Sequence, residues 1–138
     1  MIFAVRPKHK MQIATDASTI AVFDLEALRH RIDADGDWWT CPEFPELQEE
    51  IACGNIYLID THHDGIFDVT IETEELDRSR KINVPSGTLY IVCGEEIPAE
   101  GLTPELIRGG AHLDLKSNFA VVSHRVDGNR IRLCIRET

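Results

Sequence analysis

The stretch Phe119–Arg136, FAVVSHRVDGNRIRLCIR, decides the fold class of this 138-residue chain. Two apolar-rich runs flank the turn Asp127-Gly128-Asn129, and Asp-Gly between such runs is a strong β-hairpin signal because glycine tolerates the positive φ of tight turns. The second run alternates apolar and mostly cationic side chains, which predicts one buried and one exposed face. Its apolar residues are Ile131, Leu133 and Ile135, and its others are Arg130, Arg132, Cys134 and Arg136.

Similar period-two patterns occur along the rest of the chain and predict further strands. Turn-forming pairs such as Asp64-Gly65 and Ser86-Gly87 separate these patterns. In Ile66–Glu72, apolar residues alternate with polar ones, as in an antiparallel strand with one solvent-exposed face. The other predicted strands are one that opens at Met11 and the segments Thr19–Phe23, Asn55–Asp60, Arg80–Val84 and Thr88–Cys93.

Three short helices are predicted in the connections. Asp24 precedes the first and can cap it, because an aspartate side chain accepts a backbone N–H of the first turn. Pro45 suits the start of the second helix and Gly54 its end. The predicted spans are Leu25–Ile32, Glu46–Cys53 and a single turn between Thr103-Pro104 and Gly109-Gly110.

Strands outnumber helices and are joined by short turns, which is typical of mainly β proteins. The sequence therefore predicts an antiparallel β-sandwich or partly open barrel with two or three short helices in its connections. The length suits a single domain, residues 1–138. Residues 1–10 are a candidate loosely attached N-terminal extension, because the first strand pattern opens only at Met11.

Charge and composition exclude several classes of function. The formal net charge is −10 and the pI is about 4.9, whereas nucleic-acid-binding surfaces are basic, so no nucleic-acid partner is expected. No apolar run approaches the ~20 residues of a membrane-spanning helix, and the first ten residues lack the apolar core of a secretory signal. The cysteines lack metal-binding spacing and are expected to be reduced thiols of a cytoplasmic protein. They are Cys41, Cys53, Cys93 and Cys134.

Acidic residues are concentrated in the middle of the chain, and neither lysine nor arginine occurs from Ile32 to Asp77. Aromatic rings interleaved with carboxylates resemble the composition of protein interfaces, in which a few large rings supply most of the binding energy. The residues predicted to contact a basic protein partner are Asp35, Asp37, Trp38, Trp39, Glu43, Phe44 and Glu46. The alternative interpretation places Trp38 in the core and Trp39 at its rim, with the acids as a solvated face.

Two motifs contain metal-binding residue types. Asp33–Asp37 resembles the start of a calcium loop, but its glycine is fourth instead of sixth, and Phe44 stands where a bidentate glutamate is needed. His62-His63-Asp64 lies at a predicted hairpin tip, where adjacent side chains point in opposite directions. We therefore predict an acidic turn and a polar turn, and neither a metal nor a cofactor. An atypical calcium site at Asp33–Asp37 is the alternative for the first turn.

No catalytic residue is predicted. The chain lacks a Gly-x-Ser-x-Gly elbow, a reactive-cysteine signature and a glycine-rich phosphate loop. The cations on the last strand, Arg130, Arg132 and Arg136, are expected to pair with acids of neighbouring strands, and a local site for an anion or an acidic partner is the alternative.

Four motifs in order along residues 19–98 carry a resemblance to known families. They are Thr19–Asp24, Asp37–Trp39, Ala52–Asn55 and Val84–Tyr90. The first three resemble a family of small uncharacterised bacterial proteins, and the whole order resembles the competence nuclease-inhibitor family. The latter resemblance implies a β-sandwich and an acidic inhibitor that binds a nuclease without catalytic residues of its own.

The leading hypothesis is therefore a small protein-binding module, of inhibitor or immunity type, that masks a basic partner such as a nuclease or toxin. A competing hypothesis is a small-molecule-binding protein or enzyme with a carboxylate and histidine site in the mouth of the sandwich. A third is an assembly subunit that shares an apolar patch with other copies.

Overall fold

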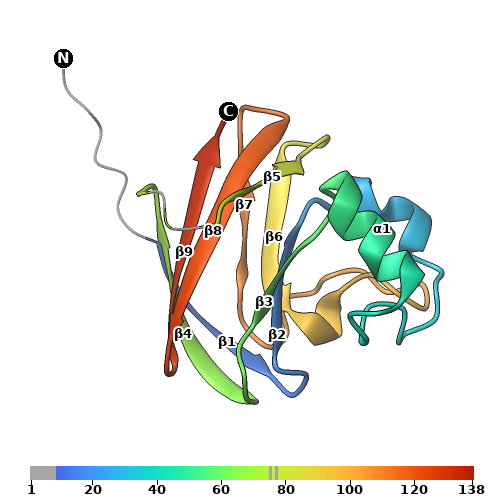
Figure 1. Ribbon diagram of the computed structural model, residues 1–138, viewed down its shortest axis with the longest axis horizontal. Coiled ribbons are helices and arrows are strands. Elements are labelled where there is room, and N and C mark those ends of the chain that lie inside the picture. The colour runs from blue at the N-terminus through green and yellow to red at the C-terminus, as the bar shows by residue number, and fades with distance from the viewer. Residues whose placement is uncertain (1–8, 75, 77) are drawn as a thin grey trace.

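The computed structural model describes residues 9–138 except for residues 75 and 77. Two β-sheets pack face to face (Figure 1). The five-stranded sheet has the order β1 (His9–Thr15), β4 (Gly65–Glu72), β9 (Arg130–Glu137), β8 (Phe119–Asp127) and β5 (Arg80–Asn83). The four-stranded sheet has the order β3 (Tyr57–Asp60), β2 (Thr19–Phe23), β6 (Thr88–Cys93) and β7 (Ala111–Asp114).

The prediction of a mainly β sandwich with short helices in its connections is confirmed. Neighbouring strands run antiparallel, except that β9 lies beside β4 in parallel, with Val69 opposite Ile131 and Ile71 opposite Leu133. The antiparallel expectation is therefore wrong for this pair. Periodicity tells which face of a strand is buried, but it does not tell which strand lies next to it.

Two apolar clusters lie on the two sides of the four-stranded sheet. The larger cluster fills the space between the sheets, where Ile20 and Val22 of β2 meet Phe67 and Leu133. The smaller one lies on the outer face, where Phe23 packs with residues of the helical connections. Because β2 and β6 are covered on both faces, their sequences are continuous apolar runs without alternation.

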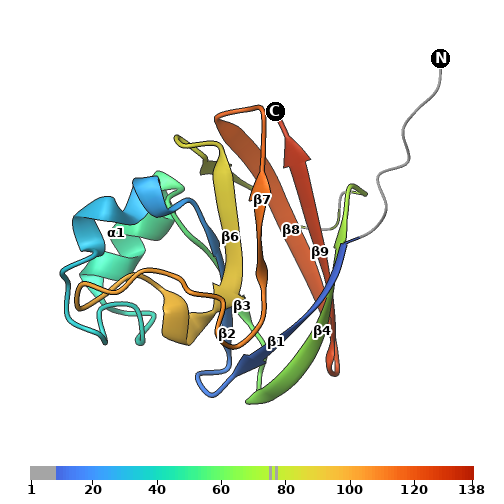
Figure 2. The ribbon, with the colours of Figure 1, turned by 180° about the vertical axis from the view of Figure 1, so that it is seen from behind.

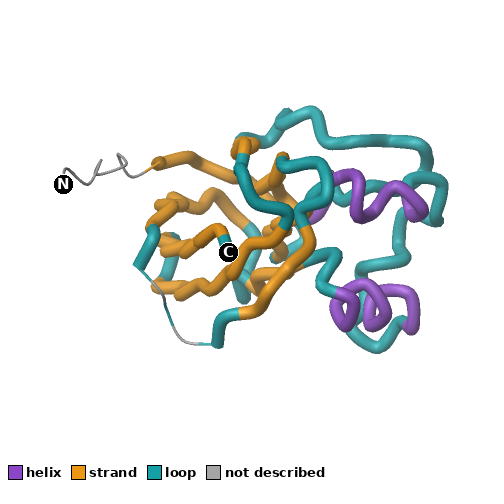
Figure 3. The backbone as a smooth tube through the Cα atoms, turned by 90° about the horizontal axis from the view of Figure 1, so that it is seen from above, coloured by secondary structure: helices purple, strands orange, loops and turns teal. Residues whose placement is uncertain are grey.

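Helices and loops form a third layer over the four-stranded sheet, on the side away from the five-stranded sheet (Figures 2 and 3). This helical layer contains η1 (Leu25–Arg31), α1 (Pro45–Cys53), η2 (Gly94–Glu96) and the connections around them. The predicted caps are confirmed: Asp24 accepts the backbone N–H of Glu26 at 2.9 Å, and Gly54 ends α1 at φ 75°. Asp24 is also buried and accepts the N–H of Ser86 at 2.7 Å, which joins η1 to the β5–β6 turn.

The prediction of a helical turn at Thr103-Pro104 is wrong. Residues 103–108 form an irregular connection, in which Leu106 has a φ of 60°. The carboxylate of Glu96 accepts the N–H groups of Glu105 and Leu106 at 2.5 and 2.7 Å. These backbone donors are thus satisfied by a side chain, and the chain does not enter a helix.

One edge strand of each sheet also differs from the prediction. β1 begins at His9, and Lys10 pairs with Thr70, so these two residues belong to the sheet and not to an N-terminal extension. Residues 1–8 of that predicted extension lie outside the described residues. The strand β7, which the sequence patterns did not predict, pairs with β6 as an edge strand.

Gly109 and Gly110 join the two sheets along one edge. Gly109 forms a bridge with Ile13 of β1, and the N–H of Gly110 donates to the carbonyl of Gln12 at 3.2 Å. Both glycines have positive φ, 89° and 99°. A Cβ at Gly109 would lie 1.9 Å from the Gln12 oxygen, and one at Gly110 would lie 2.2 Å from the Ile91 oxygen. Only glycine fits where the chain passes between β1 and β6.

Candidate functional site

The acidic stretch lies on the helical layer, and a distant segment supports it. The backbone N–H of Glu100 donates to Ala34 at 2.8 Å, that of Gly101 donates to Ile32 at 2.7 Å, and the N–H of Gly36 donates to the Glu100 carboxylate at 3.2 Å. Glu100 therefore adds a carboxylate to this side of the molecule. The exposed carboxylates here, named the acidic surface, are Asp33, Asp35, Asp37, Glu43, Glu46 and Glu100.

Both tryptophans of the predicted site lie beneath this surface. Trp38 is 4% exposed and Trp39 is 8% exposed. The Trp38 indole N–H donates to the carbonyl of Pro98 at 2.8 Å. Trp39 packs against Gly94, where an added Cβ would lie 2.8 Å from the ring. The rings hold the acidic loop onto the sheet, as the alternative interpretation expected, and they offer no surface to a partner in this conformation. Phe44 is half-buried.

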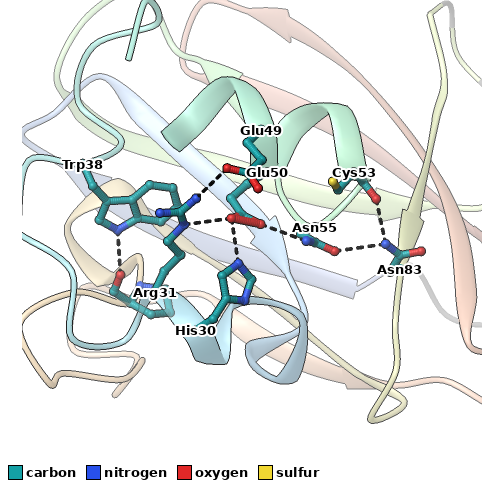
Figure 4. A network of polar contacts seen from close by, with 9 residues as sticks. His30, Arg31, Trp38, Glu49, Glu50, Cys53, Asn55 and Asn83 are labelled. Carbon is teal, nitrogen blue, oxygen red and sulfur yellow. Dashed lines mark hydrogen bonds and ion pairs between the residues drawn. The ribbon is translucent and has the colours of Figure 1, made fainter. Parts of the chain in front are cut away.

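A buried carboxylate, Glu50, connects η1 and α1 of this layer (Figure 4). Its side chain is 1% exposed and accepts from Arg31 at 2.8 Å and from Asn55 at 2.8 Å, and it meets His30 Nε2 at 2.7 Å. Arg31 also lies over the Trp38 ring, 5.6 Å from its centroid. Glu50 thus fixes the helix that precedes the acidic loop against the helix that follows it.

Two opposing effects set the pKa of Glu50. Burial raises this pKa, but the hydrogen bonds from Asn55, Arg31 and His30 together lower it by more than burial raises it. The net pKa therefore lies below the ordinary value of 4.5. The carboxylate is therefore charged in the folded protein. Because its partners are charged or strongly polar donors, it acts as a structural anion.

The network continues to the five-stranded sheet through Asn83 of β5. Its side-chain amide donates to the Cys53 carbonyl at 2.8 Å and to Asn55 Oδ1 at 3.0 Å. Its backbone N–H donates to the Gly54 carbonyl at 2.8 Å. A continuous series of polar contacts therefore connects the acidic side of the molecule with the far sheet, as Figure 4 shows.

The histidine turn does not converge on one point. His62 Nδ1 lies 3.7 Å from Asp60, His63 Nε2 contacts Asn129 at 3.1 Å, and Asp64 accepts from Ser18 at 2.8 Å. Each side chain thus has a different partner. Within the described residues, no three His, Cys, Asp or Glu side chains form a group that could hold a metal ion.

The four cysteines are free thiols, of which Cys93 and Cys134 are buried. Burial, together with Glu95 and Glu96, raises the pKa of Cys93 to about 11. Its thiol therefore stays protonated at neutral pH, which is the behaviour of a packing residue.

A histidine and a tyrosine meet between the sheets, at the edge opposite Gly109. Tyr57 of β3 and His124 Nδ1 of β8 lie 2.5 Å apart. Burial raises the pKa of Tyr57 to about 12. Burial and the nearby His62 lower the pKa of His124 below 6.5. Both groups are therefore neutral in the folded state at neutral pH.

This pair predicts a pH dependence of stability. Below pH 6.5 the unfolded chain takes up a proton at His124 that the folded chain resists, so the free energy of unfolding should decrease as the pH falls below 6.5. Urea denaturation of the wild type and of His124→Gln at pH 7.5 and pH 5.5 measures it. The variant should lose less stability between these pH values. An equal loss in both proteins would show that another group titrates.

Comparison with known proteins gives a family. Residues 7–138 match the family described as a family of unknown function, DUF6386. The chain belongs to this family. No curated protein sequence matches this DUF6386 protein.

Two solved structures share the fold over nearly the whole chain. The protein of crocagin biosynthetic gene J has 15% identity and a TM-score of 0.53, with 94% of this chain and 98% of that chain covered. ComJ from Bacillus subtilis, an inhibitor of the DNA-degrading activity of NucA, has 10% identity and a TM-score of 0.51, with 96% of each chain covered. At these identities the similarity establishes the fold, and it agrees with the resemblance to the competence nuclease-inhibitor family. Within the described residues, no helix of this DUF6386 protein is long and apolar enough to cross a membrane.

Sequence reasoning missed two residues that shape the site of this DUF6386 protein. Glu100 is 64 residues from its partner Gly36, and Asn83 is 28 residues from Asn55. No local pattern marks either residue. The buried Glu50 carried a weak signal, because the helical spacing places it beside Leu47 on the inward face of α1.

Proposed function

We propose that this chain is a protein-binding inhibitor, of the immunity or nuclease-inhibitor type, that covers a basic protein partner with its acidic surface. The observation that carries the proposal is the position of six exposed carboxylates, four from the connection between η1 and α1, one from α1 and one from residue 100, on one layer of the molecule. Such a surface attracts a basic partner and raises the rate of association.

The support beneath this surface suits a binding role. Buried Trp38 and Trp39 and the Glu50 network hold the loop in place, so little conformational entropy is lost when a partner binds. Leu102, two residues from Glu100, is 65% exposed and supplies an apolar contact beside the carboxylates. The contacts offered to the partner are therefore the acidic groups, Leu102 and the half-buried Phe44.

The fold supports the same class of function. ComJ, which covers this chain almost completely in structure, inhibits a DNA-degrading enzyme. A nuclease that binds DNA has a basic surface, and an acidic protein can cover that surface. For this chain we therefore favour a nuclease or a toxin with a basic active-site face as the partner.

Charge reversal tests the proposal. The wild-type protein, immobilised, is expected to retain a basic protein from an extract of the source organism. The variant Asp35→Lys, Asp37→Lys, Glu43→Lys, Glu46→Lys should raise the dissociation constant for that protein roughly 10- to 100-fold at 50 mM NaCl, with a smaller difference at 300 mM. Calorimetry at both salt concentrations measures the effect. If the partner is a nuclease, the wild type should also reduce its cleavage of DNA.

A matched control carries the same change of charge on strands of the two sheets and on the connection after β4. Its substitutions are Asp60→Lys, Glu74→Lys, Asp114→Lys and Asp127→Lys, all at exposed positions. It should bind the partner nearly as well as the wild type. Equal weakening by both variants, or retention of no basic protein, would argue against the acidic surface as the binding site.

A further inference from the structure

The outer edge of β7, the last strand of the four-stranded sheet, carries backbone groups that point away from β6. The N–H of Leu115 donates to the Gly87 carbonyl at 2.6 Å, so the odd-numbered residues of β7 bond to β6 and the even-numbered ones face the other way. His112 and Asp114 therefore direct their N–H and C=O groups outward. Within the described part of the chain, these four groups form no hydrogen bond with another backbone group.

The first strand, β1, closes only the start of this edge. The N–H of Gly110 donates to the Gln12 carbonyl at 3.2 Å, and Gly109 bridges Ile13. Beyond these glycines β1 continues along β4 in the other sheet, and β1 and β7 diverge (Figure 2). The next residues of the edge are open to solvent, because the side chains of His112 and Asp114 are 53% and 80% exposed.

An antiparallel second copy of β7 pairs all these groups in one register. With a two-fold axis at Leu113, His112 lies opposite the partner's Asp114, and each such pair exchanges two hydrogen bonds. An axis at His112 would instead place the partner's Asp114 opposite Gly110, whose N–H already donates to Gln12. An axis at Asp114 would bring two aspartates face to face, and like charges in such positions destabilise a sheet.

The side chains match in the same register. His112 and Asp114 lie on one face of the sheet, where the His112 ring is 6.0 Å from the Tyr90 ring and Asp114 accepts from Thr88 at 3.0 Å. Across the axis each imidazole meets a carboxylate, and opposite pairs of this kind stabilise neighbouring strands. Leu113 packs against the larger core cluster and is only half-buried. At the axis, two leucines would cover each other.

We propose that β7 is a self-association edge, through which two copies of this chain form a two-fold symmetric dimer with a continuous sheet across both copies. Isologous two-fold contacts are the commonest form of protein assembly. The contact involves the four residues of β7 from each copy. It is smaller than the interface of a stable dimer, so the dissociation constant should be on the order of 0.1 mM. Because β7 contributes no carboxylate to the acidic surface, this inference does not depend on the proposed inhibitor role.

Proline at residue 112 tests the edge and leaves the pairing with β6 intact. His112→Pro removes an N–H that points away from β6, whereas the dimer loses two of its four backbone hydrogen bonds. Sedimentation equilibrium of the full chain between about 10 µM and 1 mM should show a monomer–dimer equilibrium for the wild type and only monomer for this variant. Amide hydrogen exchange at His112 and Asp114 of the wild type should become slower as its concentration rises.

The matched control is Asp60→Pro, at the opposite edge of the same sheet. The N–H of Thr61 donates to the Ser18 carbonyl at 3.0 Å, so the N–H of Asp60 likewise points away from its neighbour β2. This variant should dimerise like the wild type. Circular dichroism shows whether both proline variants are folded, and the charge exchange below tests the edge without proline.

A charge exchange tests the register. The variant His112→Asp places an aspartate opposite the partner's Asp114 at two positions and should raise the dissociation constant about tenfold or more. The double variant His112→Asp, Asp114→His restores the pair in reversed order and should return the constant to within about threefold of the wild type. Four results would each overturn the proposal: a monomeric wild type at about 1 mM, a dimer that a folded His112→Pro variant leaves unchanged, equal weakening by both proline variants, or a double variant as weak as the single one.

Discussion

The variant Gly109→Ala is expected to lose about 3–5 kcal/mol of its free energy of unfolding, or to fail to fold. The backbone at Gly109 has a φ of 89°, where a side chain is strained by roughly 1–2 kcal/mol. In addition, the new Cβ would lie 1.9 Å from the Gln12 carbonyl oxygen, so β1 would have to move away from the glycine pair. That movement would open the edge at which the two sheets are joined, at a further cost typical of overpacking. Urea denaturation followed by circular dichroism measures the loss.

Alanine variants of two other glycines with positive φ distinguish the cost of backbone strain from the cost of a steric clash of the new Cβ. Gly128 has a φ of 60°, but no atom lies within 4 Å of the Cβ that Gly128→Ala would add. This variant should therefore lose only about 1 kcal/mol of its free energy of unfolding. Gly87 has a φ of 84°, and its added Cβ would lie 3.1 Å from the Leu115 carbonyl oxygen. The loss of stability in Gly87→Ala should therefore lie between those of the Gly128 and Gly109 variants. If all three variants lost the same free energy, the close approach at Gly109 would have no effect of its own. The Gly87 and Gly128 variants keep this comparison available when Gly109→Ala does not accumulate.

The variant Glu50→Ala is expected to lose about 3 kcal/mol of its free energy of unfolding. The substitution leaves Arg31, which is 17% exposed, and Asn55 without their shared acceptor in the interior of the helical layer. Removal of one partner of a buried charged group typically costs about 3–5 kcal/mol, and the partial exposure of Arg31 and His30 places the effect at the lower end. Chemical denaturation at pH 7 measures it.

Glu49→Ala is the matched control, because Glu49 precedes Glu50 in the same helix but is 68% exposed and only touches Arg31 at 3.2 Å. It should lose less than about 0.5 kcal/mol. The pH dependence adds a second measurement. Since the folded pKa of Glu50 is below 4.5, its stabilising effect is complete above that pH and decreases as the pH falls below it. Glu50→Ala should lack this part of the acid destabilisation, and a variant with the wild-type acid profile would contradict the assignment.

Local patterns in the sequence predicted most of the fold. The alternation in residues 130–136, the Asp-Gly turns and the caps at Asp24 and Gly54 all depend on neighbours within a few positions. The structure confirms them except at Cys134, which was expected on the exposed face with the arginines and is buried. The parallel pairing of β4 with β9 and the edge strand β7 depend on residues far apart in the chain. The turn expected at Thr103 failed for a different reason, since the side chain of Glu96 accepts the backbone N–H groups of Glu105 and Leu106 in place of a helical carbonyl.

The candidate site was predicted less completely. Composition located the acidic stretch, because charge density needs no tertiary information. It did not tell on which side of the sheet the tryptophans lie, and both are buried. Arg132 shows the reverse case: its pairing with an acid was expected, and the structure supplies Glu72 from the parallel neighbour β4. Cross-strand neighbours, such as Thr70 of β4 and Arg132 of β9, require the strand order, which a single sequence does not contain.

The position of β9 inside the five-stranded sheet has a consequence for synthesis of the protein. β1 and β4 can pair as soon as residues 9–72 have left the ribosome, but their sheet stays without its third strand until residues 130–137 follow. During that interval the hydrogen-bonding edge of β4 and one side of the interior are open to water. Such intermediates with unpaired strands are the species that chaperones protect and that aggregate at high expression. Slow translation or low temperature should therefore raise the yield of folded protein more than a change of buffer after purification.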